Sequence, residues 1–261
     1  MDVGIFIGLA VALGMILGGN ALEGGHVSSI VGGPAAMIVL GGTIGAVMVQ
    51  FPLPIVKAAI GSAKSLLKQP PHDPSQILEQ VVQFAQKART DGILALEKLA
   101  GEAHHPFLAK GILMAVDGSD SNAIRSTLEV IISQEEERTE NSAKVFEAAG
   151  GYCPTVGIIG AVFGLIHVMS NLSDIAKVGA GIASAFVATI YGVAAANIVF
   201  LPIAGRIKVR HQEETRLMEL MLSGVLAIQE GLNPKLVRDR LSGYVGEGAH
   251  AEAGGAAKAS T

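Results

Sequence analysis

Two threonines lie inside long apolar runs of the chain, where a hydroxyl group has few competing polar neighbours. Thr155 and Thr189 fall within residues 152–170 and 178–204, and neither run contains Asp, Glu, Lys or Arg. A hydroxyl offers one donor and acceptor lone pairs, so each threonine can coordinate a passing ion or orient a water. The alternative is a hydroxyl bonded to a carbonyl of its own helix. The residues alone leave both interpretations open.

Two prolines accompany these runs. Pro154 directly precedes Thr155, and Pro202 lies close to the end of the second run. Proline removes a backbone donor and kinks or ends a helix. Each proline therefore either bends a long helix or marks the place where a helix begins or ends.

A second kind of chemistry is carried by Arg89 and Glu97, which are eight residues apart in a polar region. Eight residues make about two turns of an α-helix, so we expect both charges to project from one surface of a helix. Such a pair can meet complementary charges on another protein. The alternative is two ordinary solvated charges, because a charged helix face is usually exposed to water.

Several activities are not supported by the sequence. The apolar runs contain no carboxylate, so the chain does not itself supply the titrating group that an ion pathway across a membrane needs. His104 and His105 have no Cys or Glu at a metal-binding spacing, and there is no Walker A loop. We therefore expect no enzyme, no metal and no cofactor, and the net charge of -4 favours no nucleic acid.

Membrane-spanning helices are the elements that would position these residues. The chain is 50% hydrophobic and only 16% charged, against roughly 25% charged residues in soluble domains. A spanning helix needs about 20 apolar residues. Four segments qualify, at residues 3–19, 29–51, 152–170 and 178–204. A cleaved signal peptide is the alternative for the first, but the sequence Met1-Asp2-Val3-Gly4 lacks a basic start.

Basic residues near the span ends predict the orientation, because they are enriched on the cytoplasmic side. The loop at 20–28 contains no Lys or Arg, and the loop at 171–177 contains only Lys177. Ten such residues lie between the second and third spans, and Arg206, Lys208 and Arg210 follow the fourth. The long loop and both termini are therefore predicted to be cytoplasmic.

The cytoplasmic parts are predicted to be helical. Apolar residues recur with a period of about 3.6 between residues 77 and 99, and Asp117-Gly118 indicates a turn. A polar helix over 121–146 is expected to lead into the third span. An amphipathic tail over 207–244 is broken at Asn233-Pro234. The predicted domains are spans one and two (1–52), a cytoplasmic helical domain (53–149), spans three and four (150–205), and a C-terminal helix with a disordered tail after Gly246 (206–261).

Four stretches resemble one family in order and spacing. They are residues 89–97 (RTDGILALE), 150–160 (GGYCPTVGIIG), 185–192 (AFVATIYG) and 224–231 (GVLAIQEG). Together they resemble the MotA/PomA family of flagellar motor stator subunits, over nearly the whole chain to about residue 241. The Pro-Thr-Val-Gly element is shared with the wider ExbB/TolQ relatives, whereas the first and last stretches are more specific.

The resemblance implies a fold and a set of partners. It implies an all-α integral membrane protein in the bacterial inner membrane, assembled as a ring of five copies around two single-span, MotB/PomB-like chains. The partner would supply the essential aspartate, and this chain would supply the walls of the ion pathway. The implied function is to convert ion-motive force into torque on the rotor. An ExbB/TolQ-like energiser of an envelope protein is the alternative, and a membrane enzyme is a third possibility for which no catalytic cluster is visible.

The resemblance also assigns roles to single residues. Thr155, Thr189 and Ala188 would line the ion pathway, and Pro154 would couple ion passage to helix movement. Arg89 and Glu97 would meet charges of the rotor switch protein of the C-ring. The pair Ala188-Thr189 favours protons over sodium ions, because a methyl replaces a possible oxygen ligand and hard cations prefer oxygen. Sodium remains the other candidate ion.

Small residues form a further pattern in the third span. Gly157, Gly160, Ala161 and Gly164 lie on one helical face. Such faces let transmembrane helices approach closely. We expect this face to pack between subunits rather than to bind a ligand.

Overall fold

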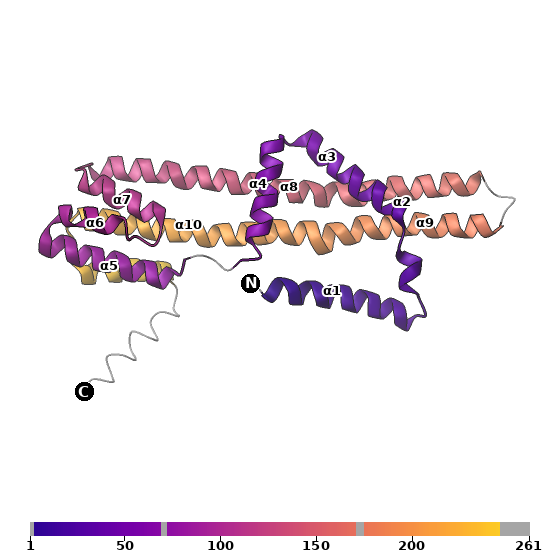
Figure 1. Cartoon of the computed structure of the whole chain (residues 1–261), viewed down its shortest axis with the longest axis horizontal. Coiled ribbons are helices and arrows are strands. Elements are labelled where there is room, and N and C mark those ends of the chain that lie inside the picture. Colours follow the sequence, from indigo (N-terminus) through magenta and orange to yellow (C-terminus); the bar gives the residue numbers. More distant parts are fainter. Residues whose placement is uncertain (1–2, 69–71, 171–174, 246–261) are drawn as a thin grey trace, which may run out of the picture. The chain divides into compact units, whose positions relative to one another are not determined.

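The computed structural model of the chain describes residues 3–68, 72–170 and 175–245, and every regular element within these ranges is a helix (Figure 1). The described residues form two compact units, the first within 1–69 and 138–209 and the second within 70–137 and from 210 onward. The predicted all-α fold class is confirmed. The disordered tail predicted after Gly246 lies outside the described residues.

The first unit contains the apolar helices. Four helices are long and apolar enough to cross a membrane, in agreement with the sequence prediction, and their bounds are Val3–Leu22, Gly33–Gln50, Ser121–Met169 and Val178–Gln229. The first is α1 (Val3–Leu22) and the third is α8 (Ser121–Met169). The fourth runs through α9 (Ile175–Ala194), the π turn η4 (Ala195–Phe200) and α10 (Leu201–Gln229).

The second span is assembled from α2 (Gly33–Ala36), the π turn η2 (Met37–Gly41) and α3 (Gly42–Gln50). It begins four residues later than predicted, because residues 27–30 form a separate 3-10 helix, η1 (Val27–Ile30), and Pro34 occupies the first helical turn. Proline is tolerated there because the first N–H groups of a helix have no internal partner. The Thr43 hydroxyl donates to the Val39 carbonyl at 2.6 Å beside the π turn.

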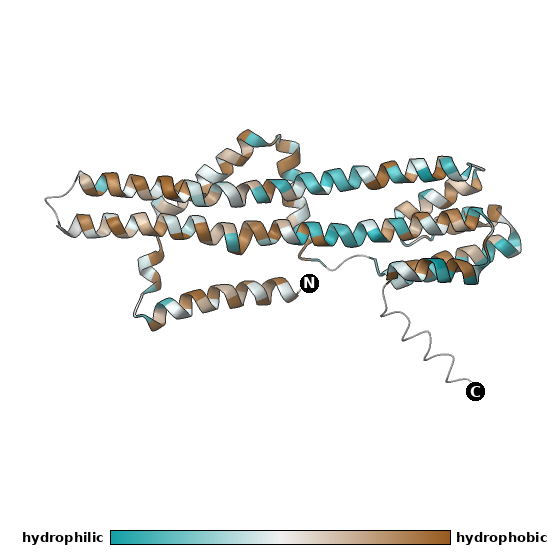
Figure 2. Cartoon of the chain, turned by 180° about the vertical axis from the view of Figure 1, so that it is seen from behind, coloured by the Kyte–Doolittle hydropathy of each residue, from teal (hydrophilic) through white to brown (hydrophobic). Residues whose placement is uncertain are grey.

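Helix α8 is continuous over 49 residues, which corresponds to about 74 Å. This length exceeds a hydrocarbon core of about 30 Å, so only the apolar part of the helix can lie in lipid. Figure 2 shows the change of hydropathy along α8, from a hydrophilic N-terminal half to a hydrophobic C-terminal half. The prediction that a polar helix leads into the third span is confirmed.

Pro202 does not end the fourth span. It occupies the second position of α10, directly after the π turn η4, and the helix continues to Gln229. Local π geometry lets neighbouring backbone groups find partners where proline has removed a donor. Of the roles that the sequence left open for Pro202, the end of a helix is excluded, and Pro202 lies within a continuous helical span.

A short helix, α4 (Leu53–Ser65), follows the second span and runs across the long helices of the first unit (Figure 1). Its Ala59 packs with Val145 and Ala149 of α8, and Leu66 at its end packs with Ile207 of α10. The charged part of α8 gives way to its apolar part at this level. Helix α4 therefore lies beside the boundary between the polar and the apolar part of α8.

The second unit is a helical bundle with its own apolar core. Its elements are α5 (Pro74–Asp91), η3 (Ile93–Ala95), α6 (Leu96–Ala100), α7 (Pro106–Val116), the start of α8, the end of α10 and α11 (Pro234–Val245). Fully buried Val81, Leu108, Leu128, Met221 and Leu241 belong to one continuous core. The predicted breaks at Asp117-Gly118 and Asn233-Pro234 are confirmed by the ends of α7 and the start of α11.

Candidate functional site

The third and fourth spans approach each other backbone to backbone. A Cβ atom added to Gly157 would lie 2.9 Å from the carbonyl oxygen of Ala188, and one added to Gly164 would lie 3.1 Å from the backbone nitrogen of Ala185. Real Cβ atoms essentially never come within 3.0 Å of another heavy atom, so a side chain at position 157 would require the backbone to shift, and the contact at Gly164 is tighter than most. The small face predicted to pack between subunits thus packs, at these glycines, against the fourth span of the same chain.

Pro154 lies at this close approach. A Cβ atom added to Gly192 would lie 3.1 Å from the Cα atom of Pro154, inside the continuous helix α8. Because proline has no N–H, the carbonyl of Gly150 lacks its usual helical donor. The hydrogen bonding of span three is therefore interrupted where span four approaches it closely, and the coupling role of Pro154 stays a prediction.

The two candidate hydroxyls differ in their surroundings. Thr155 is exposed, and its Oγ1 donates to the carbonyl of Tyr152 at 2.8 Å. Thr189 is half-buried, and its Oγ1 lies 3.5 Å from the carbonyl oxygen of Ala185, which is at the limit of a hydrogen bond. Each hydroxyl thus directs its proton to its own helix, as the alternative interpretation proposed. The oxygen lone pairs remain available as acceptors for a cation or a water.

Ala188, the third predicted pathway residue, is only 2% exposed. A Cβ atom added to Gly160 would lie 2.9 Å from the Ala188 methyl, which also borders a cavity of about 180 Å³ together with Ile38 and His167. The side chain therefore lies among spans two, three and four of one chain. Its role in ion selection stays a prediction.

The apolar parts of the two spans carry no acid. Between Glu147 and Met169 in α8, and between Val178 and Gly205 in the fourth span, there is no Asp or Glu. Ile158 and Phe186 on the outer faces are 57% and 67% exposed, as expected for surfaces covered by lipid or by another chain. The arrangement supplies hydroxyl oxygens and a closely packed helix pair without a carboxylate.

Tyr191 is a positioning residue whose contacts the sequence did not indicate. Its hydroxyl donates to the carbonyl of Ile30 at 2.7 Å and accepts from the N–H of Gly32 at 3.0 Å. These two backbone groups lie immediately before the second span, where no helix satisfies them. Tyr191 therefore ties the start of span two to span four. No local pattern in the sequence indicated these contacts, because the two partners are about 160 positions away in the chain.

Ionic contacts join α8 and α10 where the apolar parts of these helices begin. Lys208 Nζ lies 2.8 Å from Glu147 Oε1 and 3.7 Å from Glu140 Oε1. The Tyr152 hydroxyl donates to Gln50 Oε1 at 2.8 Å on the same side of the unit. These contacts join the C-terminal end of span two to α8 and join α8 to α10.

Arg89 and Glu97 do not share a helix, contrary to the prediction. Helix α5 ends at Asp91, Gly92 adopts a positive φ of 84°, and Glu97 belongs to the separate helix α6. The helix ends at Gly92 because a residue with a positive φ does not continue a right-handed helix, and glycine adopts this conformation without steric cost. Both side chains are exposed, and within the described residues neither has an ion-pair partner.

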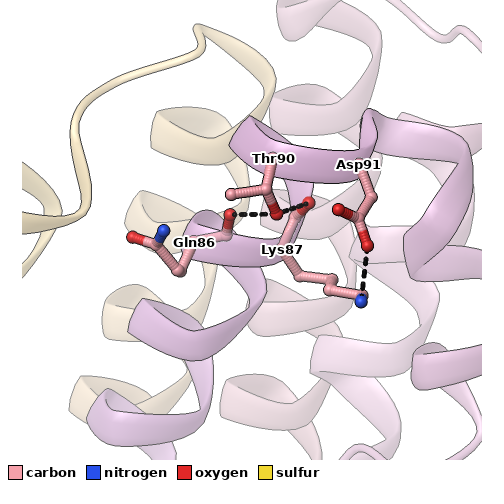
Figure 3. Close-up of polar contacts among 4 residues, drawn as sticks. All are labelled: Gln86, Lys87, Thr90 and Asp91. Atoms are coloured by element: carbon pink, nitrogen blue, oxygen red, sulfur yellow. Dashed lines mark hydrogen bonds and ion pairs between the residues drawn. The ribbon is translucent and has the colours of Figure 1, made fainter.

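The end of α5 is closed by local polar contacts (Figure 3). Lys87 Nζ lies 2.5 Å from Asp91 Oδ2, and the Thr90 hydroxyl lies 3.2 Å from the carbonyl oxygen of Gln86. The hydrogen bond from Lys87 lowers the pKa of the Asp91 carboxyl. Lys87 and Asp91 are paired with each other. Among the described residues at this helix end, Arg89 is therefore the cation that remains available to a partner.

A polar network lies in the second unit. His105 is 8% exposed, its Nδ1 accepts from the N–H of Phe107 at 3.0 Å, and its Nε2 lies 3.0 Å from Glu214 Oε1. Since Nδ1 accepts, the imidazole proton sits on Nε2 and is donated to Glu214. Burial lowers the pKa of the neighbouring His72. The network caps α7 and joins it to α10, which is a structural role.

Two family models match this chain. Residues 6–92 match the motility protein A N-terminal family, and residues 99–220 match the MotA/TolQ/ExbB proton channel family. The chain is 34% identical over 251 residues to the chemotaxis protein PomA of Vibrio alginolyticus, an alignment that covers 96% of this chain and 98% of PomA. The chain belongs to the MotA/PomA family.

Solved structures of this family share the fold. The C. jejuni MotAB structure matches with a TM-score of 0.91 at 30% identity, over 95% of this chain and 97% of the compared chain. The Bacillus subtilis flagellar MotAB stator complex matches with a TM-score of 0.88 at 32% identity, over 95% and 98% of the two chains. The resemblance seen in the sequence motifs is thereby confirmed.

Proposed function

We propose that this chain is the ion-pathway and force-transmitting subunit of a bacterial flagellar stator. The observation that carries the proposal is the contact between spans three and four. Gly157 and Gly192 bring two backbones together beside Pro154, and the exposed Thr155 lies next to this contact. The same spans contain no acid. This combination suits a chain that lines an ion pathway and changes conformation as the ion passes, without itself binding or releasing a proton.

The titrating group belongs to a partner in this proposal. A single-span, MotB/PomB-like chain supplies an aspartate within the membrane, and solved MotAB complexes of the same fold support such a partner. The membrane potential supplies about 2.3 kcal/mol per elementary charge per 100 mV. That energy is several times the thermal energy of about 0.6 kcal/mol, so each ion can bias one mechanical step.

The assembly and the ion are part of the same proposal. Five copies surround two partner chains in the inner membrane, and both termini of this chain face the cytoplasm, as the distribution of basic residues supports. The transported ion is a proton. Ala188 contributes a methyl beside Thr189, where a second threonine would contribute an oxygen ligand suited to sodium.

Force reaches the rotor through the exposed charges of the second unit. Arg89 on α5 and Glu97 on α6 flank the break at Gly92. Exposed ion pairs contribute only about 0 to 1 kcal/mol each. Such contacts form and release quickly, which suits a surface that engages the switch protein at every step.

The experiment is a double substitution, Arg89→Ala with Glu97→Ala, in a motile host that lacks its own copy of the gene. We expect normal membrane levels of the protein and loss of most motor torque, measured by the rotation of tethered cells. Lys98→Ala is the matched control, because Lys98 is also an exposed charge on α6. Intact rotation combined with a damaged cell envelope would instead identify an ExbB/TolQ-like energiser.

A further inference from the structure

An apolar groove of about 410 Å³ separates α1 from the fourth span in the first unit. One wall is a face of α1 that includes Gly4, Gly8 and Ala12, and the opposite wall includes Ile203 and Arg206 of α10. Small faces usually permit close helix packing. Here a Cβ atom added to Gly8 would meet no atom within 4 Å, and α1 has no buried residue. The small residues therefore border an open space.

The depth of the groove matches one leaflet of a bilayer. Its α1 wall extends from Gly4 to Ala12, which corresponds to about 12 Å along a helix. Its other wall extends from Asn197 to Arg206, or about 14 Å. Half of a hydrocarbon core is about 15 Å. A neighbouring transmembrane helix would need a groove through the whole core, whereas one acyl chain needs half of it.

Positive charge gathers at the cytoplasmic end of the groove. Arg206 lines this end, and so does Leu66, which closes helix α4. The segment 53–68 carries Lys57, Lys64 and Lys68 and no acidic residue. All three lysines are exposed. An amphipathic helix with basic residues at a membrane surface attracts anionic headgroups, by about 1 kcal/mol for each basic residue, or about fivefold in affinity.

We propose that this groove is a binding site for an anionic phospholipid of the cytoplasmic leaflet. One acyl chain lies between α1 and the fourth span, and the phosphate is bound by Arg206 and the lysines of α4. The lipid fills a space that α1 alone leaves open and fastens α1 to the rest of the unit. The proposal rests on the membrane orientation given above and is independent of ion transfer and of the rotor.

The test uses the full chain purified with its partner subunit in detergent. Residual lipid is removed, and dioleoyl phosphatidylglycerol or dioleoyl phosphatidylcholine is added at equal concentrations before native mass spectrometry. We expect the wild type to retain phosphatidylglycerol in preference to phosphatidylcholine. Gly8→Leu fills the groove and should lower the occupancy several-fold, and Arg206→Gln should reduce the preference for phosphatidylglycerol by about fivefold.

Gly14→Leu is the matched control, because Gly14 is on the same helix and does not line the groove. A Cβ atom added to Gly14 would also meet no atom within 4 Å. This variant should bind phosphatidylglycerol as the wild type does. If Gly8→Leu destabilises the complex, Ala12→Leu replaces it as the filling variant. Equal binding of the two lipids by the wild type, or undiminished binding after the groove is filled, would overturn the proposal. Efficient cross-linking of Ala12→Cys to a neighbouring protein chain would also overturn it, by identifying a protein occupant.

Discussion

A methyl group placed on Gly192 would lie 2.6 Å from the carbonyl oxygen of Cys153. The obstacle is backbone, so no side-chain rotation can relieve the clash. Cys153 is fully buried at this contact, and Pro154 follows it directly. The close approach of spans three and four at this point therefore requires that residue 192 has no side chain.

Gly192→Ala should force these spans apart. Overpacking of a well-packed interior costs about 1 to 3 kcal/mol, and a backbone obstacle favours the upper part of that range. We expect a lower melting temperature of the purified complex and a loss of swimming. Gly205→Ala is the control in the same unit, because a Cβ atom added there would meet no atom within 4 Å. It should leave the melting temperature and swimming unchanged. Equal effects of the two substitutions would show that the contact is not the cause.

The Thr155 hydroxyl should matter more for ion flux than for folding. Thr155→Val keeps the shape of the side chain and removes the oxygen that faces outward. A hydrogen bond to a charged group contributes about 1.5 to 3 kcal/mol, so flux should fall about tenfold to hundredfold. Thr155→Ser should retain most of it. The check is a fluorescent pH dye inside vesicles that contain the complex, and retention of full flux by the valine variant would contradict the assignment.

Tyr191→Phe tests the connection between spans two and four. The change removes the hydroxyl that serves both Ile30 and Gly32 and leaves these backbone groups without that partner. An unsatisfied buried group costs about 1 to 3 kcal/mol. We expect a lower melting temperature with little change in the second unit, which hydrogen exchange followed by mass spectrometry can resolve. An unchanged exchange rate for residues 30–32 would argue against the clamp.

Acid should weaken the contact between α5 and α11. Arg238 Nη2 donates to Glu79 Oε2 at 2.7 Å, and this hydrogen bond lowers the pKa of Glu79 below its ordinary 4.5. The folded state thus favours the carboxylate, so the contribution is full above pH 4.5 and is lost as the pH falls through the lowered value. The pair is half-exposed, so the contribution is below about 1 kcal/mol.

The measurement is the melting temperature of Glu79→Gln relative to wild type between pH 7 and pH 3. At pH 7 the wild type should melt at a slightly higher temperature than the variant, and this difference should shrink as the pH falls through the lowered pKa of Glu79. Glu97→Gln serves as the control, because Glu97 is exposed and makes no ion pair within the described residues. A difference that grew with acid would mean that Glu79 is stabilised in its protonated form.

The periodic features of the chain were predictable from the sequence. The four apolar runs, the polar helix that continues into span three and the break at Asn233-Pro234 depend on local composition, and the structure agrees with each. The roles of Thr155 and Pro154 came from the family resemblance, because the residues alone left other interpretations open, and these roles stay predictions.

Features that depend on distant parts of the chain were not predictable in this way. Tyr191 finds its partners about 160 residues away, and no local pattern identifies them. The contact of Gly192 with Cys153 likewise requires the register between two helices. The division of Arg89 and Glu97 between two helices was missed although Asp91-Gly92 is a turn signal, because the apolar period continues across it.

The central claim is that this chain forms the wall of an ion pathway and borrows its titrating acid from another chain. The most direct measurement reconstitutes the purified chain, with and without its single-span partner, into vesicles under an applied potential and records internal pH. We expect proton entry only when the partner is present with its membrane aspartate intact. Proton entry through the chain alone, at a rate comparable to that of the complex, would contradict it.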